Sequence, residues 1–260
     1  MARIGVRIVT QAVQRSLLFC FAHPDDESFL VAGIACLYAE QGVHLALVTA
    51  TLGEAGKCGD PPLCSREELP AVRERELRAA ARLLGLGDPV LLGYRDRELA
   101  SAPPMEIRQK LVAVIREHRP QVVLTFDPNG SNLHPDHIAI SRFTSDAVAA
   151  ASDPRWFPET GAAHLVQRLA WTPPSRPWLF ARTGDLAAQP GVDFAFDISR
   201  FSSRKADALR VHRTQHLNTQ RVFFSQPDVD KLLGLETFRQ AFGPALRSRP
   251  SHDLFDGIEA

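Results

Sequence analysis

Short apolar runs alternate with amphipathic segments along residues 16–150 of the chain. The runs have the length and composition of buried strands, and they lie at Ser16–Phe21, 43–49, 89–92 and 121–126. The segments between them carry apolar residues at helical spacing, at 27–41, 65–84, 105–118 and 136–150. Because strands that alternate with helices form a parallel sheet, we predict a Rossmann-like α/β fold, with a mostly parallel sheet flanked by helices.

The pattern changes after residue 151, where prolines become more frequent. Three further apolar segments predict strands at 166–172, 178–181 and 194–198. Residues 199–216 show the pattern of a basic amphipathic helix, and residues 228–242 indicate one more helix. We predict a single domain over residues 1–260, whose embellished C-terminal third, roughly 151–260, caps the site formed by the first part.

Polar residues gather directly after the first predicted strand. The turn Ala22-His23-Pro24-Asp25-Asp26-Glu27 separates that strand from the helix that follows. Doubly wound sheets bind their ligands at the carboxyl ends of strands. Imidazole and carboxylate are also the ligands that catalytic zinc takes, with one position left for water. Capping and turn chemistry use the same residue types, but they do not account for a second cluster of the same kind.

The second cluster is His134-Pro135-Asp136-His137, which also lies between a predicted strand and a predicted helix. In the usual strand order 3-2-1-4-5, the first and fourth strands are neighbours and border the point where the order reverses. The two clusters are therefore expected to form one metal site. His23 and one of Asp25 or Asp26 would bind the metal from the first cluster, and His134 and His137 offer one ligand and one acid.

Composition narrows the function further. The 30 basic and 30 acidic side chains balance, and no polybasic run favours nucleic acid as a partner. No run approaches the roughly 18 apolar residues that span a bilayer, and the N-terminal residues lack the pattern of a signal peptide, so we expect a cytoplasmic protein. The first turn also lacks the glycine pattern that binds dinucleotides.

The four cysteines do not form a recognisable metal motif. Cys20 lies in a predicted strand and Cys36 on the apolar face of a predicted helix, so we expect both in the core. Five residues separate Cys58 from Cys64, which is wider than the usual zinc pair, and no second pair is present. We interpret these two as loop cysteines.

The two motifs resemble the signatures of the PIG-L/LmbE-like deacetylases. The segment from Ala22 to Glu27 resembles their first motif, and the segment from His134 to His137 resembles their second. Further matches are Gly53-Glu54, Tyr94-Arg95-Asp96 and the stretch from Lys205 to Gln215. This family has a Rossmann-like fold and usually uses zinc. Its members remove an acyl group, typically acetyl, from an amide nitrogen of glucosamine-containing substrates.

The resemblance implies a role for each matching residue. His23, Asp26 and His137 would bind Zn²⁺, and iron(II) or cobalt could occupy the same ligands. Asp25 would be the general base. His134 would stabilise the tetrahedral oxyanion or assist the departing amine.

The same resemblance extends to the substrate. Arg73 and Asp96 match positions that hold sugar hydroxyls. After Asp96 the family often continues with Ser-Gly, whereas this chain has Arg97 and Glu98, which would place charges near the substrate entrance. We expect His212 to pack on its helix.

We therefore predict a zinc-dependent N-deacetylase, a hydrolase of amide C–N bonds, whose partner is a small glucosamine-containing substrate. Two alternatives stay open. One is an amidase that cleaves a bulkier thiol-cofactor conjugate with the same residues. The other is a binding module that has lost catalysis on the same fold, against which the presence of Asp25 and His134 counts. The sequence also leaves open whether the chain forms a homo-oligomer.

Overall fold

A computed structural model describes residues 14–173, 186, 189 and 191–259. Within these residues seven strands form one sheet in the order β3-β2-β1-β4-β5-β7-β6. Neighbouring strands among the first five are parallel, and β7 runs antiparallel to β5 and β6. The Rossmann-like fold and the strand order 3-2-1-4-5 are therefore confirmed. The strands are β1 (Ser16–Phe21), β2 (His44–Thr51), β3 (Val90–Tyr94), β4 (Val122–Thr125), β5 (Arg168–Trp171), β6 (Phe194–Asp197) and β7 (Leu235–Phe242).

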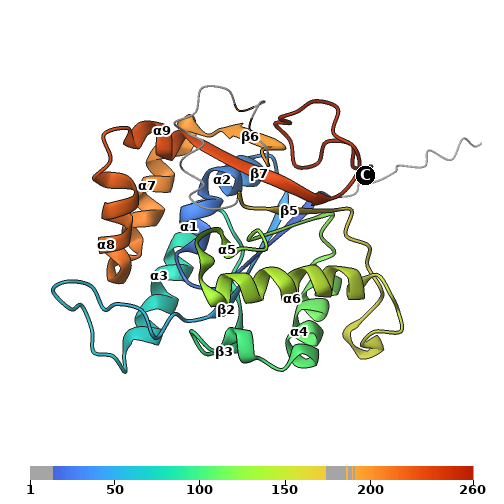
Figure 1. The fold of residues 1–260 in the computed structure, drawn as a ribbon, viewed down its shortest axis with the longest axis horizontal. Coiled ribbons are helices and arrows are strands. Elements are labelled where there is room, and N and C mark those ends of the chain that lie inside the picture. The colour runs from blue at the N-terminus through green and yellow to red at the C-terminus, as the bar shows by residue number, and fades with distance from the viewer. Residues whose placement is uncertain (1–13, 174–185, 187–188, 190, 260) are drawn as a thin grey trace, which may run out of the picture.

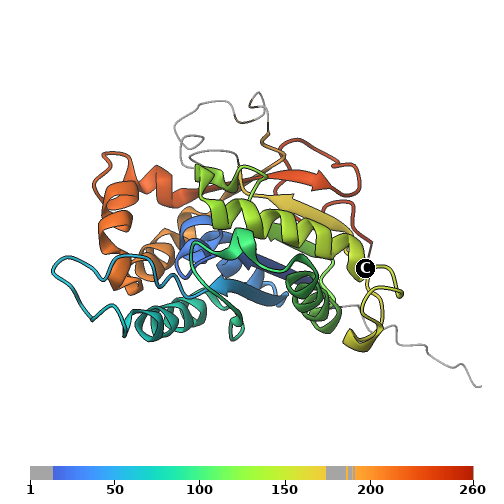
Figure 2. The same ribbon diagram turned by 60° about the horizontal axis from the view of Figure 1, so that its bottom comes forward.

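Helices cover both faces of the sheet, as Figures 1 and 2 show. One group contains α2 (Ala32–Glu40), α3 (Leu69–Leu84) and α7 (Ser202–Val211), which pack against one another. The other contains α4 (Pro104–His118) and α6 (Pro135–Ala151). Shorter helices lie at the ends of these elements: α1 (Asp26–Leu30), α5 (Gly130–Leu133), α8 (His216–Thr219) and α9 (Val229–Gly234). No helix of the described part is both long and apolar enough to cross a membrane.

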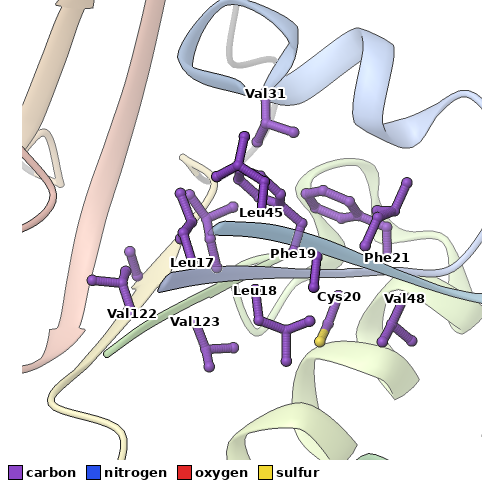
Figure 3. Close-up of a cluster of buried hydrophobic side chains, with 14 of the residues drawn as sticks. Leu17, Leu18, Phe19, Cys20, Phe21, Val31, Leu45, Val48, Val122 and Val123 are labelled. Carbon is purple, nitrogen blue, oxygen red and sulfur yellow. The ribbon is translucent and has the colours of Figure 1, made fainter. Parts of the chain in front are cut away.

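The central strand β1 is buried along its whole length. Phe19 and Phe21 lie on the side of Val31, while Leu18 and Cys20 point to the opposite face (Figure 3). A strand that helices cover on both faces has no polar face, which is why its sequence is a continuous apolar run. This strand leads directly into the first polar turn and fixes where that turn begins.

The helix expected at 27–41 is instead two helices, because the chain breaks at Val31, with φ −136°. The free N–H groups of Gly33 and Ile34, in the first turn of α2, donate to the carboxylate of Glu236, each at 2.9 Å. A carboxylate at a helix N-terminus is a favourable partner for such groups. This partner lies more than 200 positions away on β7, so the local pattern could not reveal the break.

The C-terminal third differs most from the expectations. The strands expected at 166–172 and 194–198 are β5 and β6, while the segment 178–181 lies outside the described residues. The helix expected at 199–216 is shorter and ends as α7 at Val211. The segment 228–242 holds the expected helix as α9, whereas residues 235–242 form β7 between β5 and β6, which was not expected. The single-domain boundaries stay a prediction.

Candidate metal and catalytic site

The two polar clusters of the sequence meet at the carboxyl ends of β1 and β4. These strands pair in parallel, with Leu17 opposite Val122 and Phe19 opposite Leu124. The chain leaves β1 into α1, and it leaves β4 through α5 into α6. A pocket of about 250 Å³ opens at this edge. Its lining includes all the residues that the sequence analysis placed in the site, namely His23, Asp25, Asp26, Arg73, Asp96, His134 and His137.

His23, Asp26 and His137 form a compact cluster in this pocket. His23 Nδ1 lies 3.0 Å from His137 Nε2. Asp26 places Oδ1 3.5 Å from His137 Nε2 and Oδ2 3.8 Å from His23 Nδ1. Ligand bonds of about 2.0–2.1 Å in a tetrahedron place ligand atoms roughly 3.3 Å apart. The spacings of 3.0 Å and 3.5 Å to His137 Nε2 suit a single zinc ion, and the 3.8 Å spacing joins His23 to the second oxygen of Asp26.

Hydrogen bonds behind the two imidazoles decide which nitrogens face each other. His23 Nε2 lies 3.1 Å from Asp96 Oδ1 and 3.2 Å from Asp136 Oδ2, to which it donates. His137 Nδ1 donates to the carbonyl of Gly130 at 3.1 Å. Bonds of this kind set the tautomer of metal-binding histidines. The remaining nitrogens, His23 Nδ1 and His137 Nε2, are left to share a cation, which is either a proton or a metal ion.

The electrostatic field at the cluster favours that cation. Burial alone would lower the pKa of His23, but its bonds to Asp136 and Asp96 and the charge of Asp26 raise that pKa to about 10. Burial and the positive charge of His23 hold the pKa of His137 well below its usual range. Three carboxylates around two imidazoles thus stabilise positive charge, so the donor set fits a divalent metal.

Two overlapping groups of side chains could also hold a metal, since each offers ligand atoms within 4.8 Å of one another. One is His23 with His134 and His137, and the other is His23 with Asp96 and Asp136. In the second group, Oδ2 of Asp136 already accepts the backbone N–H of Arg97 at 2.6 Å. The first group shares His23 and His137 with the cluster described above.

Asp25 occupies a strained position beside the cluster. Its φ of 117° lies where residues other than glycine are rare. One carboxylate oxygen lies 3.6 Å from Nη2 of Arg73. Burial raises the pKa of Asp25 to about 7; Arg73 opposes this shift, and the carboxylates of Asp26 and Glu27 add to it. A pocket-lining carboxylate that titrates near neutral pH has the property of a general base.

Arg73 reaches the site from α3 and is 3% exposed. It donates to the carbonyl of Gly53 at 2.8 Å and to the carbonyl of Pro24. Gly53 has φ +64°, which favours glycine, and a Cβ there would lie 1.9 Å from Nη1 of Arg73, so a larger residue would displace the guanidinium. The guanidinium therefore supports the turn that carries Asp25. Its contact with sugar hydroxyls stays a prediction.

His134 is half-buried and caps the N-terminus of α6. Its Nδ1 accepts the backbone N–H of Asp136 at 3.2 Å, which leaves Nε2 as the donor of the ring. Burial and the charge of His23 lower the pKa of His134, so the ring is neutral at neutral pH. Its centroid lies 4.8 Å from that of His23. A neutral N–H donor next to the cluster can bind an oxyanion.

Sequence reasoning did not assign a role to four polar residues of this region. Asp136 lies within the second motif, and this position in the sequence could have indicated that it belongs to the site. Gln215, Asn218 and Arg221 line the pocket from the C-terminal third. Their spacing of three residues places them on one side of the helical segment that contains α8, and this spacing could have indicated a shared face.

Other expectations have mixed outcomes. Of the two charges expected near the entrance, Arg97 lines the pocket, whereas Glu98 does not and lies 3.8 Å from Arg95. Asp96 is held at the pocket by the N–H of Ala55, at 3.0 Å. His212 does more than pack, because its Nε2 lies 2.7 Å from Glu27.

All four cysteines are free, with Cys20 and Cys36 buried as expected and Cys58 and Cys64 half-buried.

Comparisons of the sequence with known proteins are consistent with this site. The family PIG-L, described as GlcNAc-PI de-N-acetylase, matches residues 18–148. A probable N-acetyl-alpha-D-glucosaminyl L-malate deacetylase 2 of Bacillus anthracis is 42% identical over 137 residues, which is 52% of this chain and 60% of that protein. A 1D-myo-inositol 2-acetamido-2-deoxy-alpha-D-glucopyranoside deacetylase of Thermobifida fusca is 32% identical over 286 aligned positions, which cover 94% of this chain and 97% of that protein.

The fold is also that of a solved structure. The N,N'-diacetylchitobiose deacetylase from Pyrococcus horikoshii matches with a TM-score of 0.68 and 24% identity. The match covers 87% of this chain and 83% of that protein. At this identity the likeness concerns the architecture, and the reaction has to be argued from the site residues.

Proposed function

The chain belongs to the PIG-L family, and from this membership and the site we propose that it hydrolyses the N-acetyl group of a small glucosamine-containing substrate. The products are acetate and a free amine. The observation that carries the proposal is the convergence of His23 Nδ1, His137 Nε2 and the Asp26 carboxylate beside Asp25. The relatives named above are deacetylases of N-acetylglucosamine-containing compounds, which supports the reaction class.

His23, Asp26 and His137 would hold the metal, which we propose to be zinc. When bound, zinc supplies Lewis acidity, which lowers the pKa of water towards about 7 and polarises a carbonyl group. Asp96 and Asp136 accept the proton on Nε2 of His23 and keep its Nδ1 turned to the site. Iron(II) or cobalt fits the same mixed set of imidazole and carboxylate ligands.

Asp25 would act as the general base. Its carboxylate lines the pocket next to the proposed ligands, and its pKa of about 7, raised by burial, matches a proton acceptor that works at neutral pH. It takes a proton from the attacking water at a carboxylate oxygen. Arg73 Nη2, 3.6 Å away, restrains the direction of that carboxylate.

His134 would stabilise the oxyanion through its Nε2–H. The backbone N–H of Asp136 occupies the other nitrogen, so the donor is fixed before substrate binds. Burial and the charge of His23 lower the pKa of His134. At neutral pH the neutral ring therefore donates a hydrogen bond and does not carry the extra proton that a general acid needs. This favours oxyanion stabilisation over protonation of the amine.

Two arginines at the pocket favour a substrate with an acidic group beyond the sugar. Arg97 and Arg221 line the pocket from separate segments, and both are exposed. Among the described residues no ion pair involves either guanidinium, and Nη2 of Arg221 donates to Oδ1 of Asn218 at 3.5 Å. Guanidinium groups that lack a carboxylate partner bind carboxylates and phosphates well. We therefore propose an acidic aglycone, as in the malate conjugate of the Bacillus relative, ahead of a neutral inositol.

The size of the pocket bears on the rival activity. At about 250 Å³ it lies slightly below the roughly 300–1,000 Å³ typical of ligand pockets, which favours a small glucosaminide over a bulky thiol-cofactor conjugate.

The proposed function is tested with a panel of three substrates: N-acetylglucosaminyl malate, N-acetylglucosaminyl inositol and a thiol-cofactor conjugate, with acetate and free amine measured together. Equal release of both from the malate conjugate supports the proposal. Cleavage of the thiol-cofactor conjugate alone would contradict the deacetylase proposal and support the amidase activity instead.

A further inference from the structure

A buried chain of hydrogen bonds connects the C-terminal third to the candidate base. His212 follows α7, and its Nε2 lies 2.7 Å from Oε1 of Glu27. Oε2 of Glu27 accepts the backbone N–H of Asp25 at 3.1 Å. Glu27 is 1% exposed and His212 is 0% exposed, so water does not compete for these bonds.

The two oxygens of Glu27 have separate tasks. Oε1 is anchored by His212 Nε2 and by the hydroxyl of Ser28, at 2.5 Å. Oε2 is thereby directed to the N–H of Asp25. Without His212, one of the two anchors of Oε1 is lost, and the carboxylate can rotate away from Asp25. A buried carboxylate that loses a charge-assisted bond also tends to find another partner.

The backbone of Asp25 needs such a restraint. Its φ of 117° is sparsely populated for a residue with a side chain and persists only where the surroundings hold it. The N–H groups of Ser28 and Phe29 fix its carbonyl, each at 3.0 Å, and Glu27 fixes its N–H. With both peptide groups held, the direction of the Asp25 carboxylate is set by the backbone.

We propose that His212 is a positioning residue for the reaction: by anchoring Glu27 it fixes the backbone of Asp25 and therefore the aim of its carboxylate. This inference rests on the proposed deacetylation, in which Asp25 is the base. His212 does not line the pocket, and its hydrogen bond towards the site goes to Glu27.

A purely structural role is the competing explanation, since α1 and α7 pack against each other and the bond also joins them. Both explanations predict lower stability when the bond is removed. Only positioning predicts a fall in kcat at unchanged KM and metal content, because a displacement of about 1 Å at a reacting group can cost roughly 100-fold in rate.

The experiment compares His212→Gln with His212→Asn in the full chain. Both substitutions leave a polar amide, but only the glutamine side chain is long enough to place an N–H where Nε2 of His212 meets Glu27. The control is Tyr38→Phe, which removes hydrogen bonds to Asp253 and Leu254, none of which lines the pocket. The readouts are kcat, KM, zinc content, thermal midpoint and the backbone amide resonance of Asp25.

Positioning predicts that His212→Asn lowers kcat about tenfold or more, with KM within about twofold, zinc retained and the Asp25 amide resonance displaced. His212→Gln recovers most of kcat and the resonance. Tyr38→Phe loses stability and keeps kcat. An Asn variant whose kcat falls no more than that of Tyr38→Phe at equal loss of stability would overturn the inference.

Two further measurements keep the test decisive. If His212→Asn does not fold, hydrogen exchange in the unmodified protein decides: a protected Asp25 amide supports the inference and a freely exchanging one overturns it. If the unmodified protein releases no acetate from any glucosaminide, the proposed function fails on its own. The Asp25 amide then still reports on His212, because it shifts in the Asn variant if His212 positions it and stays in place if it does not.

Discussion

His23 Nδ1 and His137 Nε2 face each other at 3.0 Å, although 114 positions separate the two residues. Parallel pairing of β1 with β4 brings them together, and each ring is held from behind by its own partner. Two imidazole nitrogens at this distance, with the carboxylate of Asp26 beside them, form a group that can hold a cation.

Replacing Asp25 with asparagine should abolish turnover while the metal stays bound. Asparagine keeps the shape of the side chain but cannot accept a proton, and general-base catalysis contributes roughly 10²–10⁴-fold. Because Asp25 is not among the proposed ligands, zinc content by mass spectrometry should remain that of the unmodified protein. Retention of more than about a tenth of kcat would remove the general-base assignment.

Replacing Asp136 with asparagine should weaken metal binding without removing a ligand. Its Oδ2 lies 3.2 Å from Nε2 of His23, and outer partners of this kind are worth about 10–100-fold in metal affinity. Competition with a chelator of known affinity measures the change. Asp146→Asn is the control, because Asp146 lies on the same helix and pairs with Arg108 at the surface. Equal zinc affinity in both variants would contradict the role of Asp136.

Neutralising Arg97 and Arg221 should change substrate preference more than catalysis. For each of Arg97→Gln and Arg221→Gln, kcat/KM on N-acetylglucosaminyl malate should fall about tenfold, since a charge-assisted bond contributes about 1.5–3 kcal/mol. Activity on a neutral glucosaminide should stay within about twofold. Arg95→Gln is the matched control, because the side chain of Arg95 is 76% exposed and lies 3.8 Å from Glu98. Parallel losses on both substrates would count against an acidic aglycone.

Thiol labelling should divide the cysteines into two classes. Burial raises the pKa of Cys20 to about 12, and burial also raises the pKa of Cys36. The reactive form is the thiolate, so both should resist labelling at pH 8 in the folded protein. Cys58 and Cys64 are free and half-buried, and they should react first. Rapid labelling of Cys20, located by peptide mass spectrometry, would contradict its place in the core.

The first half of the fold could be predicted because its signals are local. Ser16–Phe21 is a continuous apolar run that helices cover on both faces, and the strand order followed from a general rule for doubly wound sheets. That rule also brought the two polar clusters together. The choice of Asp26 over Asp25 as a ligand came from the family resemblance, because two adjacent carboxylates look alike in a sequence.

The remaining features depend on distant partners. Residues 235–242 include Leu, Glu, Arg, Gln and Ala, which are good helix formers, yet pairing with β5 and β6 makes them a strand. The break at Val31 depends on Glu236, and the role of His212 depends on Glu27, which precedes it by 185 positions. Such pairings arise only from the assembled fold, so no local pattern indicates them.

The central claim is that His23, Asp26 and His137 hold a metal that the hydrolysis requires. The direct measurement is acetate release from N-acetylglucosaminyl malate by the purified chain, before chelation, after chelation and after zinc is restored. The expected result is about one zinc per chain, loss of acetate release on chelation and recovery of release with zinc. His137→Ala should bind no zinc and stay inactive. The control His44→Ala, which changes the exposed pair with His118, should behave as the unmodified protein. Undiminished release by the chelated chain, or full zinc binding by His137→Ala, would contradict the central claim.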